Sequence, residues 1–292
     1  MLRFLKKIKS DFSIIFLFTM VLLCVLTPIY LNQKSSVKPI VDREDVKQDV
    51  LKITAEDMRT EPRDERNIYL STLDKNYVIN EPGDYVLTGE FKHTIYIDVE
   101  EKIVHLFLDN VAIDSMEGAG IYVVSAAKVV ITLLPDSVNY MVDAPVRSEN
   151  TEEKATIMSN ADLTINGSGE LIVEGYYGDG IRTKDMLKIL DASVNLQSKG
   201  DGIRGNDGIL LKSKHIQIES EKNGVYTSDV GKAGKGTVKI ESGTVCVIAG
   251  EYGILSRGDL IVEASLISGN GVRGLYYCEG QCSIEEGCIN NE

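Results

Sequence analysis

Two groups of acidic side chains recur at a fixed spacing in the C-terminal half of the chain. Asp179, Asp201 and Asn223 are 22 residues apart, and each comes directly before a glycine and an apolar residue. A second group, at the far end of the same loops, comprises Asp185, Asp207 and Asp229. Stacked repeats would bring like carboxylates to within about 5 Å, where they need a positive partner. Ca²⁺ takes about six to eight oxygen ligands, so these six residues form a predicted calcium site.

A second interpretation of the same corners needs no metal. Asp and Asn before Gly form turns readily, because their side chains bond to nearby backbone groups. Arg182, Arg204, Lys184 and Lys199 lie close by in the sequence and could supply the countercharge. Both interpretations of the acidic columns stay open at this point.

Aromatic and basic side chains beside these corners suggest a sugar ligand. The chain has 13 Tyr and no Trp, so tyrosines must provide any platform on which sugar rings stack. The predicted substrate-binding residues are Arg182, Arg204, Tyr176, Tyr177, Tyr226 and Tyr252. The alternative is that the tyrosines cap the corners by packing on neighbouring repeats.

Catalysis is harder to support from the residues. Asp201, Arg204 and Asp207 could imitate a pectate lyase, in which Asp-bound Ca²⁺ acidifies a proton and an arginine removes it. The same trio occurs in the preceding repeat, which favours a structural unit over one catalytic site. No nucleophile elbow is present, and no histidine has a Cys or Asp at a telling spacing. No catalytic residue is predicted.

Self-similarity indicates the architecture that would position these residues. Apolar columns recur through successive repeats, the first being Ile181, Ile203, Val225 and Ile254, and the next Leu187, Ile209, Val238 and Leu260. One repeat needs an insertion within 229–237 to stay in register. Alternating runs of this length suit one turn of a solenoid with short strands. We therefore expect an all-β fold, a right-handed parallel β-helix of about eight to ten coils.

The N-terminus differs from the rest of the chain. Residues 12–31 are twenty residues without a formal charge, preceded by Arg3 and three lysines. This pattern predicts one transmembrane helix, a signal anchor with a cytoplasmic N-terminus and an extracytoplasmic remainder. A cleaved signal peptide is the rival interpretation. The expected organisation is a basic end and anchor over 1–31, a polar stalk over 32–66, and the β-helix domain with its Cys-containing tail over 67–292.

The net charge and the cysteines limit the kinds of partner and metal site that the chain can have. The net charge of −13 argues against nucleic acid, because phosphate binding needs clustered Lys and Arg. Cys278, Cys282 and Cys288 lie near the C-terminus at a spacing that fits no common zinc pattern. A disulfide that caps the tail is the preferred interpretation.

Longer motifs resemble a known family. The run NYVINEPGDYVLTGEF, starting at Asn76, is followed by IYIDVEEKIVHLFLDNVAIDS, GAGIYVVSAAKVVITLL, GDGIRTKD and GDGIRGND. Together they resemble the clostridial carbohydrate-binding β-helix family over roughly 76–274. The resemblance implies a pectate-lyase-like parallel β-helix that binds calcium and acidic polysaccharides such as polygalacturonate, without established cleavage. Asp179, Asp185, Asp201 and Asp207 lie in the matching motif, whereas the segment 143–155 interrupts the pattern.

The sequence thus predicts a membrane-anchored, extracellular, non-catalytic protein that binds an acidic polysaccharide or cell-wall glycan with Ca²⁺. The alternatives are a pectate-lyase-like polysaccharide lyase and a purely structural cell-envelope protein.

Overall fold

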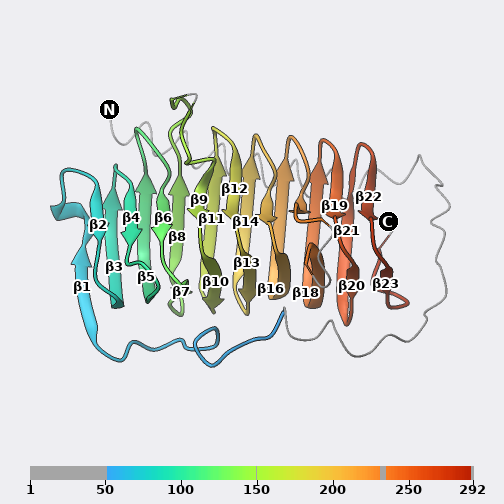
Figure 1. Cartoon of the computed structure of the whole chain (residues 1–292), viewed down its shortest axis with the longest axis horizontal. Helices are drawn as coiled ribbons and strands as arrows, with labels where there is room; N and C mark the ends of the chain where they lie inside the picture. Colours follow the sequence, from blue (N-terminus) through green and yellow to red (C-terminus); the bar gives the residue numbers. More distant parts are fainter. Residues whose placement is uncertain (1–50, 149, 231–234, 291–292) are drawn as a thin grey trace.

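The computed structural model describes residues 51–148, 150–230 and 235–290, and the chain there consists mainly of β-strands. Within these ranges the one helix is a short 3-10 turn, η1 (Leu70–Thr72). The strands stand side by side along the long axis of the molecule, from β1 at one end to β22 and β23 at the other (Figure 1).

All strand pairings are parallel and fall into two sheets. The nine-stranded sheet contains, in order, β2 (Tyr77–Ile79), β4 (Ile95–Asp98), β6 (Ile121–Ser125), β9 (Ala155–Ser159), β12 (Asp179–Thr183), β15 (Ile203–Gly205), β17 (Val225–Thr227), β19 (Tyr252–Ser256) and β22 (Gly274–Cys278). The fourteen-stranded sheet contains β1 (Glu65–Tyr69), β3 (Gly83–Phe91), β5 (Ile103–Asp114), β7 (Lys128–Leu133), β8 (Val138–Val142), β10 (Asp162–Gly167), β11 (Glu170–Gly175), β13 (Met186–Leu190), β14 (Ser193–Ser198), β16 (Gly208–Ser220), β18 (Thr237–Ala249), β20 (Leu260–Val262), β21 (Ser265–Gly271) and β23 (Cys282–Ile284).

Apolar residues that align in the sequence are neighbours in the sheets. Ile181 pairs with Ile203, Ile203 with Val225, and Val225 with Ile254. All four side chains are fully buried and belong to one continuous apolar core. Because the pairing is parallel and in register, each residue type lies directly beside its equivalent one strand away. The same register therefore also places polar residues in rows.

Glycines at the corners allow the close approach of successive strands. A Cβ at Gly202 would lie 2.4 Å from Ile218 Cγ2, and one at Gly224 would lie 2.1 Å from Val247 Cγ2. Any side chain there would displace the buried apolar residues of the neighbouring strand. This packing explains why Gly follows Asp201 and Asn223.

The prediction of a right-handed parallel β-helix, that is, a simple solenoid that follows a transmembrane helix, is wrong. The strands are organised into sheets differently. The long strands β5 and β16 continue through positions where a corner was expected, and each pairs with strands on both sides of that position. The pairings β13-β10-β7-β5-β8-β11-β14-β16, closed by β13–β16, form a barrel-like ring of eight parallel strands. The physical reason is that a residue expected at a corner can be left unpaired at a shift in the strand register, so that the strand continues past it. Asn110, for example, takes a positive φ of 53° within β5 and is skipped in the β3–β5 register.

The membrane prediction is corrected as well. The expected anchor, 12–31, lies outside the described residues. Across the part of the chain that the structure describes, no helix has the length and apolar character to span a bilayer. The described residues therefore do not support the transmembrane helix and the single-pass location that the sequence predicts.

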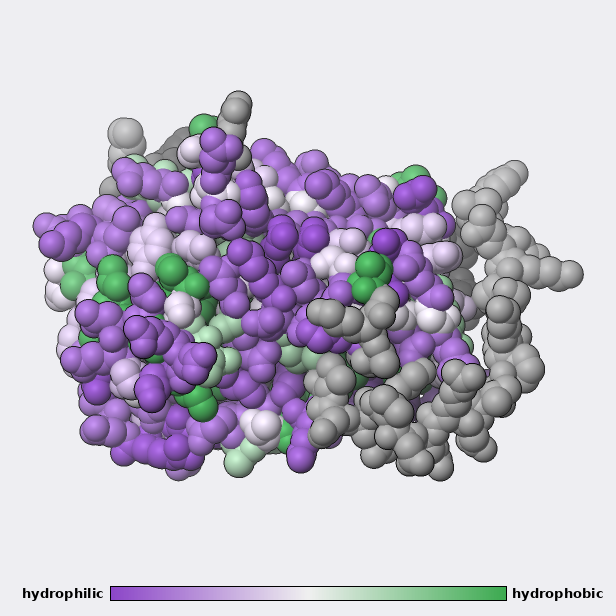
Figure 2. Space-filling view, in the orientation of Figure 1, coloured by the Kyte–Doolittle hydropathy of each residue, from purple (hydrophilic) through white to green (hydrophobic). Residues whose placement is uncertain are grey.

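Both ends of the described chain are tied to the sheets. Residues 51–64, within the expected stalk, run along the lower edge in Figure 1 as a blue trace and bond to the fourteen-stranded sheet through the fully buried Asp57. At the other end Cys278 and Cys282 form a disulfide, as the capping interpretation of the tail predicts. Figure 2 shows a mainly hydrophilic face with only small, separate apolar patches.

The core register predicts a large effect of truncation at Ile203. Ile203→Ala should lower the free energy of unfolding by about 2–5 kcal/mol, because it leaves a cavity among fully buried neighbours. Ile103→Ala is the matched control, since Ile103 is 40% exposed, and should cost less than about 1 kcal/mol. Urea unfolding of both variants measures the difference, and equal losses would contradict the described core.

Candidate carbohydrate-binding face

The first acidic column forms a buried ladder of hydrogen bonds. The backbone N–H of Asp201 donates to Asp179 Oδ1 at 2.8 Å, and that of Asn223 donates to Asp201 Oδ1 at 3.1 Å. The backbone N–H of Tyr252 continues the ladder by donating to Asn223 Oδ1 at 3.2 Å. Asp179, Asp201 and Asn223 are at most 6% exposed. The column therefore fastens successive strands to one another through the side chains.

Arginines supply the countercharge of this ladder. Arg182 donates to Asp179 Oδ2 at 3.2 Å, and Arg204 donates to Asp201 Oδ2 at 3.4 Å. Burial, and then the charge of Asp201, raise the pKa of Asp179 above its ordinary value. Two carboxylates one strand apart thus remain next to each other because each is paired with its own guanidinium.

A lysine holds the second acidic column. Lys235, in the insertion between two repeats, donates to Asp207 Oδ2 and lies 3.9 Å from Asp229 Oδ2. The hydrogen bond that Lys235 donates to Asp207 raises the pKa of Lys235. Burial, and then the charges of neighbouring acidic groups, raise the pKa of Asp185. The ammonium group stands where a cation between the carboxylates would be expected.

These contacts bear on the predicted calcium site. Within the described ranges, no three His, Cys, Asp or Glu side chains gather at a spacing that could hold a metal ion. Calcium at the first column would have to displace Arg182 and Arg204, and at the second it would have to displace Lys235. The six predicted ligands therefore fit the ion poorly as they stand.

Three of the six predicted sugar-binding residues, Arg182, Arg204 and Tyr226, share a row on the nine-stranded sheet. Arg182 pairs with Arg204, Arg204 with Tyr226, Tyr226 with Leu255, and Leu255 with Tyr277. These five residues alternate with the buried core positions, so their side chains point outward. We call them the outer row.

Contacts within the outer row bring cationic and aromatic groups together. The Arg204 guanidinium carbon lies 4.8 Å from the ring centroid of Tyr226, in cation–π contact. The side chains of Arg182 and Arg204 are 20% and 23% exposed. Their Nε atoms are buried without a hydrogen-bond partner among the described contacts.

A loop covers the continuation of the row toward the N-terminus. The next positions are Met158, Tyr122 and Tyr96, and they pack together in a small buried cluster. The Tyr96 hydroxyl donates to Glu153 Oε1 at 2.9 Å. Glu153 belongs to the segment 143–155, which was expected to interrupt the repeats. This loop therefore defines where the open part of the face begins.

Two of the remaining predicted tyrosines contact arginines at the edges of the face. Arg147 lies 4.9 Å above the ring of Tyr177, which ties that tyrosine to the covering loop. Tyr252 packs against Tyr277 with ring centroids 5.4 Å apart, and Arg273 lies 5.4 Å from the Tyr252 ring. Tyr252 thus belongs near the outer row, whereas Tyr177 has a structural contact.

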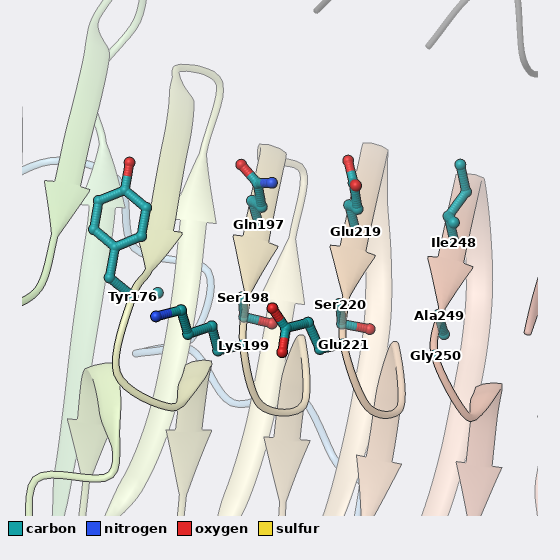
Figure 3. Close-up of a pocket in the computed structure, with 11 residues that line it drawn as sticks. Tyr176, Gln197, Ser198, Lys199, Glu219, Ser220, Glu221, Ile248, Ala249 and Gly250 are labelled. Atoms are coloured by element: carbon teal, nitrogen blue, oxygen red, sulfur yellow. The ribbon is translucent and has the colours of Figure 1, made fainter. Parts of the chain in front are cut away.

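Tyr176 lies in a separate groove of about 380 Å³ on the fourteen-stranded sheet. Figure 3 shows Tyr176 at one end, with Gln197, Glu219 and Ile248 in a row on successive strands. Glu219 Oε2 is buried and has no hydrogen-bond partner in the described structure. The structure therefore separates Tyr176 from the other predicted sugar-binding residues.

The sequence prediction missed part of each site. Leu255 and Tyr277 belong to the outer row, and extending the repeat columns past Tyr226 would have identified them. Gln197 and Glu219 could have been found in the same way, as outward positions 22 residues apart. Lys235 carried no such signal, because it lies in an insertion outside the repeat.

Three comparisons place the chain among known proteins. A family model described as carbohydrate-binding domain-containing protein matches residues 73–274. A curated protein of the same description from Acetivibrio thermocellus is 31% identical over 135 residues, 44% of this chain and 47% of that protein, so the chain spans about half of its length. A solved structure, described as the polysaccharide lyase-like protein from C. thermocellum in a gadolinium derivative, superposes with a TM-score of 0.73 at 27% identity, over 77% of this chain and 98% of that one.

The ladder predicts a graded response to substitution at Asp201. Asp201→Ala should lower the free energy of unfolding by about 1–3 kcal/mol, because it leaves buried donors without an acceptor. Asp201→Asn should recover part of this loss, since Asn223 Oδ1 already accepts the backbone N–H of Tyr252 at the equivalent position of the ladder. Asp74→Ala, at an exposed aspartate, serves as the control. Thermal unfolding that ranks the asparagine variant with or below the alanine variant would rule out the acceptor role.

Proposed function

The chain belongs to the family of carbohydrate-binding domain-containing proteins, and from that premise we propose that its ligand is an acidic polysaccharide, polygalacturonate-like, bound along the outer row. The observation that carries this proposal is the in-register row of Arg182, Arg204, Tyr226 and Tyr277 on the outside of one sheet. A polymer that lies along such a row meets two guanidinium groups at one end and the tyrosine rings at the other.

The chemistry of the row matches a uronic acid. The faces of Tyr226 and Tyr277 can stack on sugar rings, and Tyr277 is 46% exposed. A guanidinium has five N–H donors in a planar fork that suits a carboxylate. Within the described residues each arginine donates one hydrogen bond to its aspartate, so further donors remain for a ligand.

The aspartates limit how strongly the row attracts a polyanion. Asp179 and Asp201 offset the charges of Arg182 and Arg204, and the whole chain carries −13. Binding therefore relies on directional hydrogen bonds and ring stacking more than on long-range attraction. We expect the affinity to fall only modestly between low and physiological salt, unlike that of a polycation.

Calcium stays a prediction from the sequence and is not part of the proposed binding step. The gadolinium derivative of the related structure contains a cation that prefers oxygen ligands, as Ca²⁺ does. In this chain Asp179 and Asp201, two of the carboxylates predicted as ligands, already contact arginines, and Asp207 and Asp229 contact Lys235.

A polysaccharide lyase is the second candidate, favoured by the lyase-like description of the related structure. Burial, and then the charge of Arg204, lower the pKa of Arg182, which is the direction that a general base requires. A lyase would release unsaturated, ultraviolet-absorbing products from polygalacturonate, and Arg182→Ala and Arg204→Ala would each abolish their formation.

The binding proposal predicts a loss at Tyr226. Tyr226→Ala should weaken binding to polygalacturonate about tenfold, because it removes a stacking face and the cation–π partner of Arg204. Tyr140→Ala removes a tyrosine that is 46% exposed on the other sheet and should leave binding unchanged. Affinity electrophoresis in polygalacturonate gels, with a neutral polysaccharide as reference, measures both. Unchanged retention of a folded Tyr226→Ala protein would refute the outer row as the site.

Calcium is tested without the polysaccharide. Adding millimolar Ca²⁺ or a chelator to the purified protein should leave its melting temperature unchanged, because the acidic columns already have cationic partners. A rise of several degrees with Ca²⁺, absent in the Asp207→Ala variant, would instead support the calcium site predicted from the sequence.

A further inference from the structure

Residues 51–64, which we call the N-terminal strap, run along the lower edge of the strands in Figure 1 and contact side chains of the fourteen-stranded sheet. The strap bonds to Lys188 on β13, Thr164 on β10, Lys128 on β7 and Asp84 on β3. It forms no strand of its own before β1. Its contacts with the sheet are therefore made mainly by side chains and not by a backbone ladder.

The central contact is a carboxylate held by three side chains of the sheet. Lys128 Nζ donates to Asp57 Oδ1 at 2.8 Å, and Lys188 Nζ donates to Asp57 Oδ2 at 2.8 Å. Thr164 Oγ1 donates to Asp57 Oδ1 at 2.6 Å. We call Lys128, Thr164 and Lys188 the carboxylate cradle.

The cradle is a built anion site and not a chance surface contact. Lys188 is 5% exposed, and the side chain of Lys128 is 12% exposed. Two ammonium groups that are largely shielded from solvent and bind the same carboxylate require that anion, because burying them without it costs several kcal/mol. The two ammonium groups and the Thr164 hydroxyl belong to neighbouring strands of the sheet, whereas the anion and two further donors to it, the backbone N–H and the hydroxyl of Thr54, belong to the strap. Donors and anion thus belong to parts of the chain that could separate.

Groups beside the cradle match the rest of a sugar. Asn166 Nδ2 donates to the carbonyl oxygens of Asp57 and Arg59 at 2.8 and 3.0 Å, as it could to hydroxyl or ring oxygens. The face of Phe107 lies under the Arg59 guanidinium at 5.7 Å. A carboxylate cradle, an amide donor and an aromatic face side by side are the groups that a uronic acid residue would meet in a binding groove.

We propose that the carboxylate cradle is a second acidic-sugar site, on a different sheet from the outer row, and that the strap occupies it in cis through Asp57. In the strapped state the site is closed, and a uronate carboxylate enters when the strap is displaced. The strap then acts as a tethered competitor whose high local concentration weakens the apparent affinity for free sugar. The site does not depend on the outer row.

Chemical rescue tests the cradle directly in the full chain. Asp57→Ala should lower the melting temperature, because Lys128 and Lys188 lose their anion. Millimolar galacturonate should then raise the melting temperature of the variant by about 3 °C or more, and that of the wild type by less. The neutral methyl ester of galacturonate and sodium chloride should not rescue. Removing a donor as well, in Asp57→Ala with Lys188→Met, should abolish the rescue.

Two further variants separate the possible outcomes. Asp57→Ala combined with Tyr226→Ala should still be rescued, so failure of the outer row as a site would leave this result intact. If Asp57→Ala does not fold, Arg59→Gln with Arg63→Gln keeps the cradle, removes the ion pair between the strap and Asp84 of β3, and removes the pair of Arg63 with Glu56 inside the strap. That variant should bind trigalacturonate at least tenfold more tightly than the wild type by calorimetry. The proposal would be overturned if galacturonate did not rescue a folded Asp57→Ala protein, or if the methyl ester rescued it equally well. It would also be overturned if the variant with the loosened strap did not bind trigalacturonate more tightly.

Discussion

Parallel strands in register place each side chain directly beside its counterpart on the next strand, about 4.8 Å away. A repeated apolar residue gains from this constraint, because equivalent side chains stack into a continuous core, as from Ile181 to Ile254. A repeated charge does not, since like charges at this distance repel. Much of the polar chemistry of this chain follows from how that repulsion is offset.

The chain offsets it with its own counterions. Each aspartate of the buried ladder has an arginine three residues later, and the second acidic column meets the lysine of an insertion. The reverse case occurs on the fourteen-stranded sheet, where the buried Lys188 and the partly buried Lys128 share Asp57 of the strap. An ion pair within one repeat holds that repeat, whereas a pair made with an insertion or a strap links distant parts of the chain. The second kind can also be exchanged for a ligand of the same charge.

The sequence predicted the parts of this structure that repeat. Spacing alone identified the apolar columns and the Asp179, Asp201 and Asn223 ladder as neighbours, because register follows directly from a constant period. It also indicated Arg182 and Arg204 as possible countercharges. It did not predict that β5 and β16 run on through expected corners, since one residue such as Asn110 can be absorbed in a long strand without any change in hydrophobic pattern. The partners of Lys235 and Asp57 were missed because both residues lie outside the repeat, where only the folded chain shows what they contact.

The outer row is the feature on which the proposed function rests, and a footprint of the bound polymer tests it most directly. Hydroxyl-radical footprinting with and without polygalacturonate reports the solvent exposure of individual tyrosines. We predict protection of Tyr226 and Tyr277, with no change at Tyr69 and Tyr140, which are 64% and 46% exposed on the other sheet. A ligand on this face would be contradicted by protection at Tyr69 and Tyr140 but not at Tyr226 and Tyr277. It would also be contradicted if no tyrosine were protected at a polymer concentration that saturates binding.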